Sequence, residues 1–355
     1  MSTLGPRVPP PVSQSIPPSP DWHGIAARYQ GSSARRALGQ VATTLGPLAA
    51  AFYLMYRALA WSHGLMLLLA IPTAGLLIRT FVIMHDCSHG SFLAWRRGND
   101  LVGYLTGVIT LTPFGQWRHE HALHHASSGD LDRRGNGDIT TLTVREYLGR
   151  TRWGRVRYRL FRHPAVMLGL GPLNVIFGQR VIARPTAGGA RDTRSVWATN
   201  AGIAIVVLGF ALVIGVRAVA WIYLPVCYLA AAGGIWLFYV QHQFDGAYWE
   251  PHKQWDFATA AIAGSSYLKL PGVLRWLTAS IGLHHVHHLA PRIPNYRLQR
   301  CHDENDLFHR AHVVTLAGSL RLFRLALWDE DQHRLVGFDH LRAYGPAHGA
   351  AAVGH

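Results

Sequence analysis

Residues 64–89, GLMLLLAIPTAGLLIRTFVIMHDCSH, join a long apolar run directly to two histidines. Two further histidine groups follow, HALHH at residues 121–125 and HHVHH at residues 284–288. Side chains spaced i, i+3 and i+4 share one face of a helix, so each HxxHH presents three imidazoles in one direction. If the three segments converge, they supply enough nitrogen ligands for two metal ions.

The composition indicates a membrane protein. The 355 residues are 49% hydrophobic and 15% charged, and the mean hydropathy of +0.10 is high for a soluble globular protein. We therefore expect one membrane-embedded domain. The formal net charge of +15 could suggest a nucleic-acid partner. The arginines cluster between apolar runs, however, which favours a cytoplasmic face against anionic lipid and no nucleic acid.

Four apolar runs, at about residues 41–60, 64–84, 198–216 and 220–240, have the length of about 20 residues that a membrane span needs. Very short turns join the first to the second and the third to the fourth, which predicts two hairpins. Residues 118–194 carry fourteen arginines and six acidic residues. The excess of positive charge places this stretch, both termini and all three histidine groups on the cytoplasmic side.

The predicted fold is therefore an all-α integral membrane protein. It has four transmembrane helices in two hairpins and a cytoplasmic helical cap that holds a histidine-rich di-metal site. We expect a disordered Pro/Ser-rich tail at residues 1–20, a membrane domain at 21–320 and a C-terminal cytoplasmic tail at 321–355. The apolar stretches 101–114 and 165–177 are too short to cross, so they are predicted to lie at the membrane interface.

The number of histidines narrows the kind of metal site. Neutral imidazole suits zinc, copper, iron and nickel alike. A structural zinc ion needs four ligands, half of the eight present, whereas two irons with open positions for oxygen would use them all. Haem in membrane cytochromes is held by histidines inside the spans, and these histidines follow the spans. The three cysteines, Cys87, Cys227 and Cys301, form no CxxC pair.

Longer phrases surround the histidines, namely HDCSHGSF at 85–92, WRHEHALHHASSGDLDRRGNGD at 117–138, QHQFDGAYWE at 241–250 and IGLHHVHHLAPRIPNYRL at 281–298. With these phrases, roughly residues 21–308 resemble the integral-membrane fatty acid desaturases, particularly their bacterial acyl-lipid omega-6 (delta-12) branch. The resemblance implies a di-iron centre that activates O2 and introduces a cis double bond into an acyl chain of membrane lipid. The implied iron ligands are His85, His89, His121, His124, His125, His284, His287 and His288.

His242, in QHQF at the end of the fourth span, matches the extra histidine that such sites use, although a lone histidine there could also be a helix cap. Ligating histidines usually donate their second N–H to a carboxylate or carbonyl. Asp86 is the strongest candidate for this role and Glu120 and Asp138 are weaker ones, while helix capping explains Asp86 equally well. No other catalytic residue is identified. His119 and His285 are off the spacing and are predicted to be neighbours of the ligands.

The electron source is expected to be a separate protein such as ferredoxin, because the sequence shows no haem-binding segment, CxxC pair or dinucleotide fingerprint. The substrate would be an acyl lipid in the bilayer, and the enzyme would reside in a bacterial inner membrane. One alternative is a hydroxylase or ketolase of the same fold, acting on an alkane, sterol or carotenoid. A remote alternative is a histidine-rich metal-binding or transport protein, whose ligands would lie within the spans.

Overall fold

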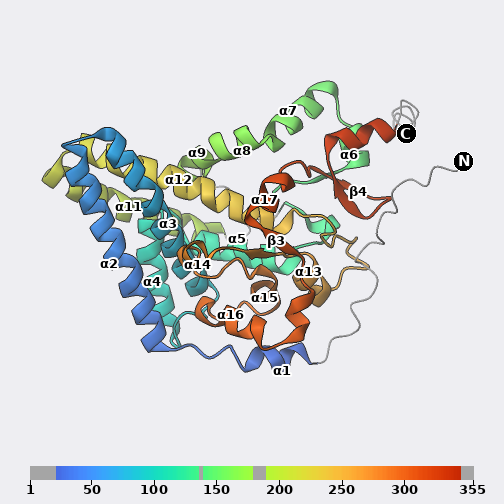
Figure 1. Ribbon diagram of the computed structural model, residues 1–355, viewed down its shortest axis with the longest axis horizontal. Helices are drawn as coiled ribbons and strands as arrows, with labels where there is room; N and C mark the ends of the chain where they lie inside the picture. Colours follow the sequence, from blue (N-terminus) through green and yellow to red (C-terminus); the bar gives the residue numbers. More distant parts are fainter. Residues whose placement is uncertain (1–20, 136–138, 179–188, 345–355) are drawn as a thin grey trace, which may run out of the picture.

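The computed structural model describes residues 21–135, 139–178 and 189–344, which are mostly helical (Figure 1). The predicted tail at 1–20 lies outside the described residues. Four helices are long and apolar enough to cross a membrane. They are α2 (Ala34–Leu59), α3 (His63–Ser88), α11 (Gly189–Ile214) and α12 (Val216–His242). Each overlaps one predicted span, so the four predicted spans correspond to four candidate membrane helices, and a bent pair, Arg152–Arg162 with Pro164–Gly178, would be a fifth candidate if it crossed as one span.

Two of these helices continue past their apolar runs into the histidine segments. The predicted spans ended at residues 84 and 240, whereas α3 continues to Ser88 and α12 to His242. A helix propagates through any residue that keeps its backbone hydrogen bonds, so a change to polar composition does not end it. His85 and His242 are therefore held in the last turns of rigid helices.

The connections between the long helices are short. Residues 60–62 join α2 to α3, and Gly215 alone separates α11 from α12. Gly215 has a φ of 84°, a left-handed conformation that glycine adopts without steric cost. The N-terminal helix α1 (Trp22–Ala27) precedes α2 at the opposite end from the residue 60–62 turn.

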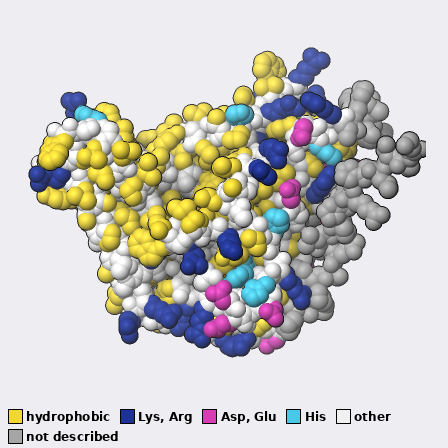
Figure 2. All heavy atoms as spheres, viewed as in Figure 1, with side chains coloured by type: hydrophobic (Ala, Val, Ile, Leu, Met, Phe, Trp, Pro, Cys, Tyr) yellow, Lys and Arg dark blue, Asp and Glu magenta, His cyan; other side chains and the backbone are white. Residues whose placement is uncertain are grey.

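Helix α3 is the central helix of the bundle. It packs against α2, α12 and α4 (Arg96–Ile109), and Met55, Met66 and Val226 are fully buried in the core between α2, α3 and α12. By contrast, α11 is largely exposed, with Leu212 at 89%. Figure 2 shows apolar side chains gathered mainly over the long helices, and charged side chains mainly over the remainder. Such a surface suits lipid contact.

A buried arginine fixes α3 against its neighbours. The Arg79 side chain, 8% exposed, donates from Nε to Thr44 Oγ1 of α2 at 3.0 Å. It also donates to the Trp276 carbonyl of α14 (Gly272–Leu277) and lies over the Trp276 ring, 4.2 Å from its centroid. An arginine within a membrane helix needs such partners, because an unpaired charge in an apolar interior is costly.

The remaining short elements form what we call the head, residues 114–178 and 243–344. Its further α-helices are α5 (Phe114–Ser127), α6 (Val144–Leu148), α7 (Arg152–Arg162), α8 (Pro164–Gly169), α9 (Gly171–Leu173), α13 (Phe257–Ala263), α15 (His284–Leu289), α16 (Asn295–Asp303) and α17 (Leu316–Leu322). Short 3-10 helices are η1 (Leu131–Arg133), η3 (Asp306–Arg310) and η4 (Phe338–Tyr344), and η2 (Asn174–Gly178) is a π-helical turn.

The head also contains short strands, so the prediction of an all-α fold is wrong there. Strands β1 (Leu142–Thr143), β4 (Leu327–Asp329) and β5 (Arg334–Val336) form a sheet in the order β1-β4-β5, with β1 parallel and β5 antiparallel to β4. Strand β2 (Tyr267–Lys269) pairs in parallel with β3 (Val313–Thr315). Strands of two or three residues are too short to produce a visible alternation of apolar and polar residues.

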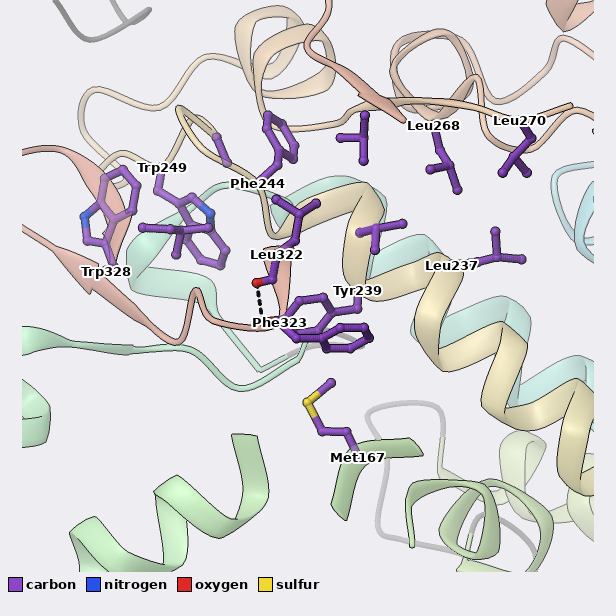
Figure 3. Close-up of a cluster of buried hydrophobic side chains, with 14 residues drawn as sticks. Met167, Leu237, Tyr239, Phe244, Trp249, Leu268, Leu270, Leu322, Phe323 and Trp328 are labelled. Carbon is purple, nitrogen blue, oxygen red and sulfur yellow. Dashed lines mark hydrogen bonds between the residues drawn. The ribbon is translucent and has the colours of Figure 1, made fainter. Parts of the chain in front are cut away.

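The end of α12 packs against the last part of the described chain (Figure 3). The Tyr239 ring stacks on Phe323 at 4.8 Å between centroids, beside Met167 of α8, and its hydroxyl donates to the Leu322 carbonyl at 3.3 Å. Trp328 of β4 is 2% exposed and belongs to the same cluster. Residues 321–344 therefore pack into the head.

The two shorter apolar stretches form short helices. Helix α4 packs along α3 with Gly103 and Gly107 buried, and it leaves Leu101 and Leu105 exposed. Helices α8, α9 and η2 follow one another without a long break. Together they form a segment that is bent by 59° relative to α7. The predicted location of both stretches at a membrane interface stays a prediction.

Candidate metal centre

All nine histidines proposed as ligands from the sequence meet in the interior of the protein. They form two groups, and within each group one nitrogen per imidazole lies within 4.8 Å of the others. The first group consists of His85, His89, His121, His125 and His287, and the second consists of His124, His242, His284 and His288. These side chains lie on α3 and the residue that follows it, on α5, on α12 and on α15, and the fold brings them together.

The two HxxHH segments are shared between the groups. In α5, the i, i+4 pair His121 and His125 belongs to the first group, while His124 belongs to the second. In α15, the i, i+4 pair His284 and His288 belongs to the second group, while His287 belongs to the first. Each of these two helices thus contributes histidines to both groups. The spacing of the histidines along each helix therefore sets the distance between the two groups.

The distances between imidazole nitrogens fit a shared metal ion. The Nε2–Nε2 distance is 3.1 Å between His121 and His125 and 3.0 Å between His125 and His287. In the second group His242 Nε2 lies 2.9 Å from His284 Nε2 and 3.2 Å from His124 Nε2. Two nitrogens bound at right angles to one ion, with bonds of about 2.1 Å, would be about 3.0 Å apart.

The protonation and hydrogen bonding of the cluster also suit metal binding. Burial and neighbouring imidazoles hold the pKa values of His121, His125, His287 and His288 well below the usual value, so these rings are neutral at pH 7, the form that binds metal. The Nε2 atoms of His85 and His89 are buried without a hydrogen-bond partner. A buried nitrogen without a partner is costly unless a ligand occupies it.

Asp86 orients His85 and ties it to a distant helix. Its Oδ1 lies 3.0 Å from His85 Nδ1, which leaves Nε2 for the metal. Its Oδ2 accepts hydrogen bonds from the backbone N–H and the side-chain amide of Asn295, at 2.6 and 2.8 Å. Asn295 is the first residue of α16. The carboxylate thus holds a histidine and also binds the N-terminus of a distant helix.

Two glycines in close backbone contacts, Gly264 and Gly282, help to position His242 and the third histidine segment. His242 Nδ1 lies 3.2 Å from the Gly264 carbonyl oxygen, and a Cβ at Gly264 would come within 2.5 Å of the Ala260 carbonyl. The carbonyl of Gly282 accepts a hydrogen bond from the Leu268 N–H of β2 at 2.8 Å. A Cβ at Gly282 would come within 2.5 Å of the Leu268 carbonyl. Only glycine lets α15 begin this close to β2.

An apolar cavity of about 350 Å³ leads to the histidines. It runs between α3 and α12 and is closed by the α4–α5 turn and by η2. His85, His121 and His284 line it together with Phe238 and Trp117. The Trp117 ring stacks on His121 at 4.2 Å between centroids.

Three polar side chains of the cavity wall are hydrogen-bonded within the protein. The hydroxyl of Thr110 donates to the Thr106 carbonyl at 2.8 Å, and Gln241 Nε2 donates to the Ile281 carbonyl at 3.0 Å. Glu120 accepts a hydrogen bond from Gln116 Nε2 at 2.9 Å. The wall therefore presents mainly hydrocarbon, which suits an alkyl chain and offers little to water.

Comparison with known proteins agrees with this geometry. The family model for fatty acid desaturases matches residues 59–317. A fatty acid desaturase of Bacillus subtilis is 40% identical over 314 residues, which cover 88% of this chain and 88% of the relative. The chain belongs to the fatty acid desaturase family. More distant desaturases include an sn-1 oleoyl-lipid 12-desaturase of Anabaena variabilis, 28% identical over 67% of this chain and 69% of the relative.

A third relative is an sn-1 acyl-lipid omega-3 desaturase (ferredoxin) of Synechocystis. It is 26% identical, and the match covers 62% of this desaturase and 61% of the relative.

The other residues singled out from the sequence lie in different places in the desaturase. Glu120 contacts Gln116, as described above, and Asp138 lies outside the described residues. His119 Nδ1 lies 2.9 Å from Asp192 of α11, and His285 Nε2 lies 3.2 Å from His302 Nδ1. Neither His119 nor His285 belongs to the two metal-ligand groups.

Two hydrogen-bonding groups near the histidines were missed from the sequence, namely Asn295, which binds Asp86, and the Gly264 carbonyl, which lies beside His242. Asn295 follows Pro294, a pattern that predicts the start of a helix, but nothing in it points to Asp86, 209 residues earlier. The Gly264 carbonyl carries no residue-specific signal at all. Both contacts depend on the folded chain.

Proposed function

We propose that this desaturase introduces a cis double bond into an acyl chain of membrane lipid, with two iron ions held by the nine histidines and O2 as co-substrate. The observation that carries the proposal is that two groups of histidines in the protein interior border an apolar cavity. A methylene group offers no acidic proton, so side-chain acid–base chemistry does not remove its hydrogens. The bound irons would supply the oxidising power.

The protein's own residues would position the reactants. The cavity wall holds the acyl chain against His85, His121 and His284 and keeps bulk water away. Asp86 fixes the ring of His85, and the Gly264 carbonyl fixes the ring of His242. The stacked Trp117 limits movement of His121.

The membrane arrangement belongs to the proposal as well. The two helix pairs α2–α3 and α11–α12 would cross a bacterial inner membrane as two hairpins, with both termini and the metal centre on the cytoplasmic side. The membrane domain would comprise residues 21–320, and residues 321–355 would be cytoplasmic. Ferredoxin would supply the electrons, as the name of the Synechocystis relative says of that protein.

The position of the double bond is proposed as delta-12 (omega-6). The Anabaena relative, at 28% identity, is named an oleoyl-lipid 12-desaturase, whereas the name of the 40% identical Bacillus relative states no position. Product analysis therefore has to locate the bond.

The test is expression in a bacterial host whose lipids contain saturated and monounsaturated acyl chains only. We expect new diunsaturated chains in the membrane lipids, identified by mass spectrometry after derivatisation that locates each double bond. Hydroxylated acyl chains would support the hydroxylase instead. A new bond elsewhere than position 12 would contradict the regiochemistry while keeping the desaturase activity.

A matched pair of buried histidines serves as the control for the metal. His242→Ala removes a proposed ligand, and His285→Ala removes a neighbour that is bonded to His302. We expect the first purified variant to lose iron and activity and the second to keep two irons per folded chain. Two irons retained in His242→Ala would contradict the nine-ligand assignment.

A further inference from the structure

A second pocket, also of about 350 Å³, lies apart from the acyl cavity. Residues of the segment that joins α1 to α2, together with the first turn of α2, form one side of it, and α16 with its C-cap residue forms the other. Four arginines line it, Arg28, Arg36, Arg297 and Arg300, and Glu304 is the one carboxylate among its described lining residues. We call this the arginine pocket. Figure 2 shows basic side chains along the lower edge of the molecule, where Figure 1 places α1 and α16.

The charge of the arginine pocket is not balanced internally. Glu304 accepts hydrogen bonds from Arg300 Nε at 2.8 Å and from the Tyr29 hydroxyl at 2.6 Å, so it is already committed. Arg28 donates to the Asn305 side-chain carbonyl at 3.3 Å. No carboxylate of the described residues forms an ion pair with Arg36 or Arg297. The pocket therefore keeps an excess of guanidinium groups, which bind carboxylates or phosphates.

The arginine pocket is connected to the metal centre through one short helix. Helix α16 begins at Asn295, and both N–H groups of Asn295 bind Asp86, which holds His85. Arg297 follows two residues later and Arg300 lies one turn beyond. The next residue after Asn295, Tyr296, donates from its hydroxyl to the Phe92 carbonyl just past the first histidine segment, at 3.2 Å. A partner bound at the pocket would thus sit next to a hydrogen-bonded route to His85.

We propose that the arginine pocket is the docking site for an acidic electron-carrier protein that reduces the metal centre. This inference rests on the proposed desaturase function. Removing two hydrogens from an acyl chain while one O2 becomes two waters consumes two additional electrons and two protons. Two reduced one-electron carriers are therefore oxidised in each turnover. Acidic carriers are attracted to an unbalanced basic surface, which raises their association rate.

A lipid headgroup is the competing occupant of such a pocket, since α2 enters the membrane nearby. The hydrogen bonds that run from α16 through Asn295 and Asp86 to His85 favour the electron carrier as the occupant. An electron carrier has to deliver electrons to the metal centre, whereas a lipid headgroup has no need of a connection to it. Helix α7 offers a second basic surface, with exposed Arg152 and Arg157. No described contact links these two arginines to the histidines, so they provide the matched control.

The test uses the full-length, iron-loaded enzyme in nanodiscs of neutral phosphatidylcholine, with a plant-type ferredoxin as the donor. Arg36→Gln/Arg297→Gln should raise the KM for ferredoxin and its directly measured Kd about tenfold, with a smaller effect at high salt. The kcat at saturating ferredoxin should stay unchanged. Arg152→Gln/Arg157→Gln should leave both constants within about twofold of the parent.

A small chemical donor, reduced methyl viologen, checks the chemistry separately. Both double variants should desaturate at the parent rate with this donor. An equal effect of the two double variants on ferredoxin binding, or none in the pocket variant, would overturn the docking site. A ferredoxin effect that appears only with phosphatidylglycerol in the nanodisc would assign the pocket to a lipid headgroup. Absence of desaturation with every donor would contradict the proposed function, and the ferredoxin Kd would still decide the docking site.

Discussion

Asp86 holds together parts of the protein that are far apart in sequence. It is 2% exposed, and its two oxygens bind His85 in α3 and Asn295 in α16. A histidine that donates its Nδ1–H to a carboxylate keeps its Nε2 lone pair for the metal and becomes a better donor ligand. The carboxylate therefore acts as a positioning residue for the proposed irons.

We predict that Asp86→Asn lowers the affinity of the site for iron, although all nine histidines are still present. An amide is neutral and holds the His85 tautomer less strongly, so iron affinity and activity should fall about 10- to 100-fold. Iron retention during chelator titration of the purified enzyme measures the effect.

Glu120→Gln is the control for Asp86→Asn. Glu120 is also adjacent to a proposed ligand in sequence, but its carboxylate accepts a hydrogen bond from Gln116. Its iron retention should match that of the parent enzyme. Equal loss of iron in both variants would mean that Asp86 has no specific part in holding His85.

At the scale of the elements, α12 shapes both the metal centre and the acyl cavity. Its last residue, His242, belongs to the second histidine group, and small residues of its middle, Ala230, Ala231 and Gly234, line the cavity. A Cβ at Gly234 would meet no atom within 4 Å. Gly234 lies eight residues before His242, about 12 Å along the helix axis.

We predict that Gly234→Leu shortens the space available to the acyl chain. The new side chain would enter the cavity without a backbone clash, and conversion of the longest acyl chains should fall at least about tenfold relative to shorter ones. The measurement is the chain-length distribution of unsaturated lipids in the expressing host.

The matched control is Gly209→Leu in α11. Gly209 is also a helical glycine with no atom within 4 Å of an added Cβ, but it is exposed and does not line the cavity. Both substitutions replace a helical glycine by leucine and increase helix propensity by a similar amount. A difference in protein stability therefore does not explain a difference between the products of the two variants. A product distribution that is unchanged in Gly234→Leu would show that the acyl chain does not pass this part of α12.

Across the whole molecule, the features that could be predicted from the sequence are those that leave a pattern within a short stretch of residues. Apolar runs locate four candidate membrane-spanning helices, and i, i+3, i+4 spacing identifies histidines that the fold brings together. Contacts between distant segments have no such signal. The buried Arg162, predicted only as part of an arginine-rich stretch, donates to Tyr239, Gln243 and the Leu325 carbonyl at 2.8–3.1 Å. These three partners lie more than 70 residues away, and composition does not reveal them.

The orientation in the membrane is tested with a matched pair of tryptophans. Trp61, in the turn between α2 and α3, is 83% exposed, and Trp153, in α7 of the head, is 78% exposed. The three native cysteines, Cys87, Cys227 and Cys301, are buried and give little background labelling. If the head is cytoplasmic, the two positions lie on opposite sides of the membrane, because α2 and α3 separate them.

We predict that Trp61→Cys reacts with a membrane-impermeant maleimide in intact bacterial cells. Trp153→Cys should react only after the inner membrane is permeabilised. Both substitutions remove an exposed ring of the same size, so any difference in stability should be small, and detergent-solubilised samples verify that both thiols are reactive. The reverse pattern would place the head and its metal centre outside the cytoplasm, where ferredoxin has no access, and labelling of both thiols in intact cells would contradict the two-hairpin arrangement.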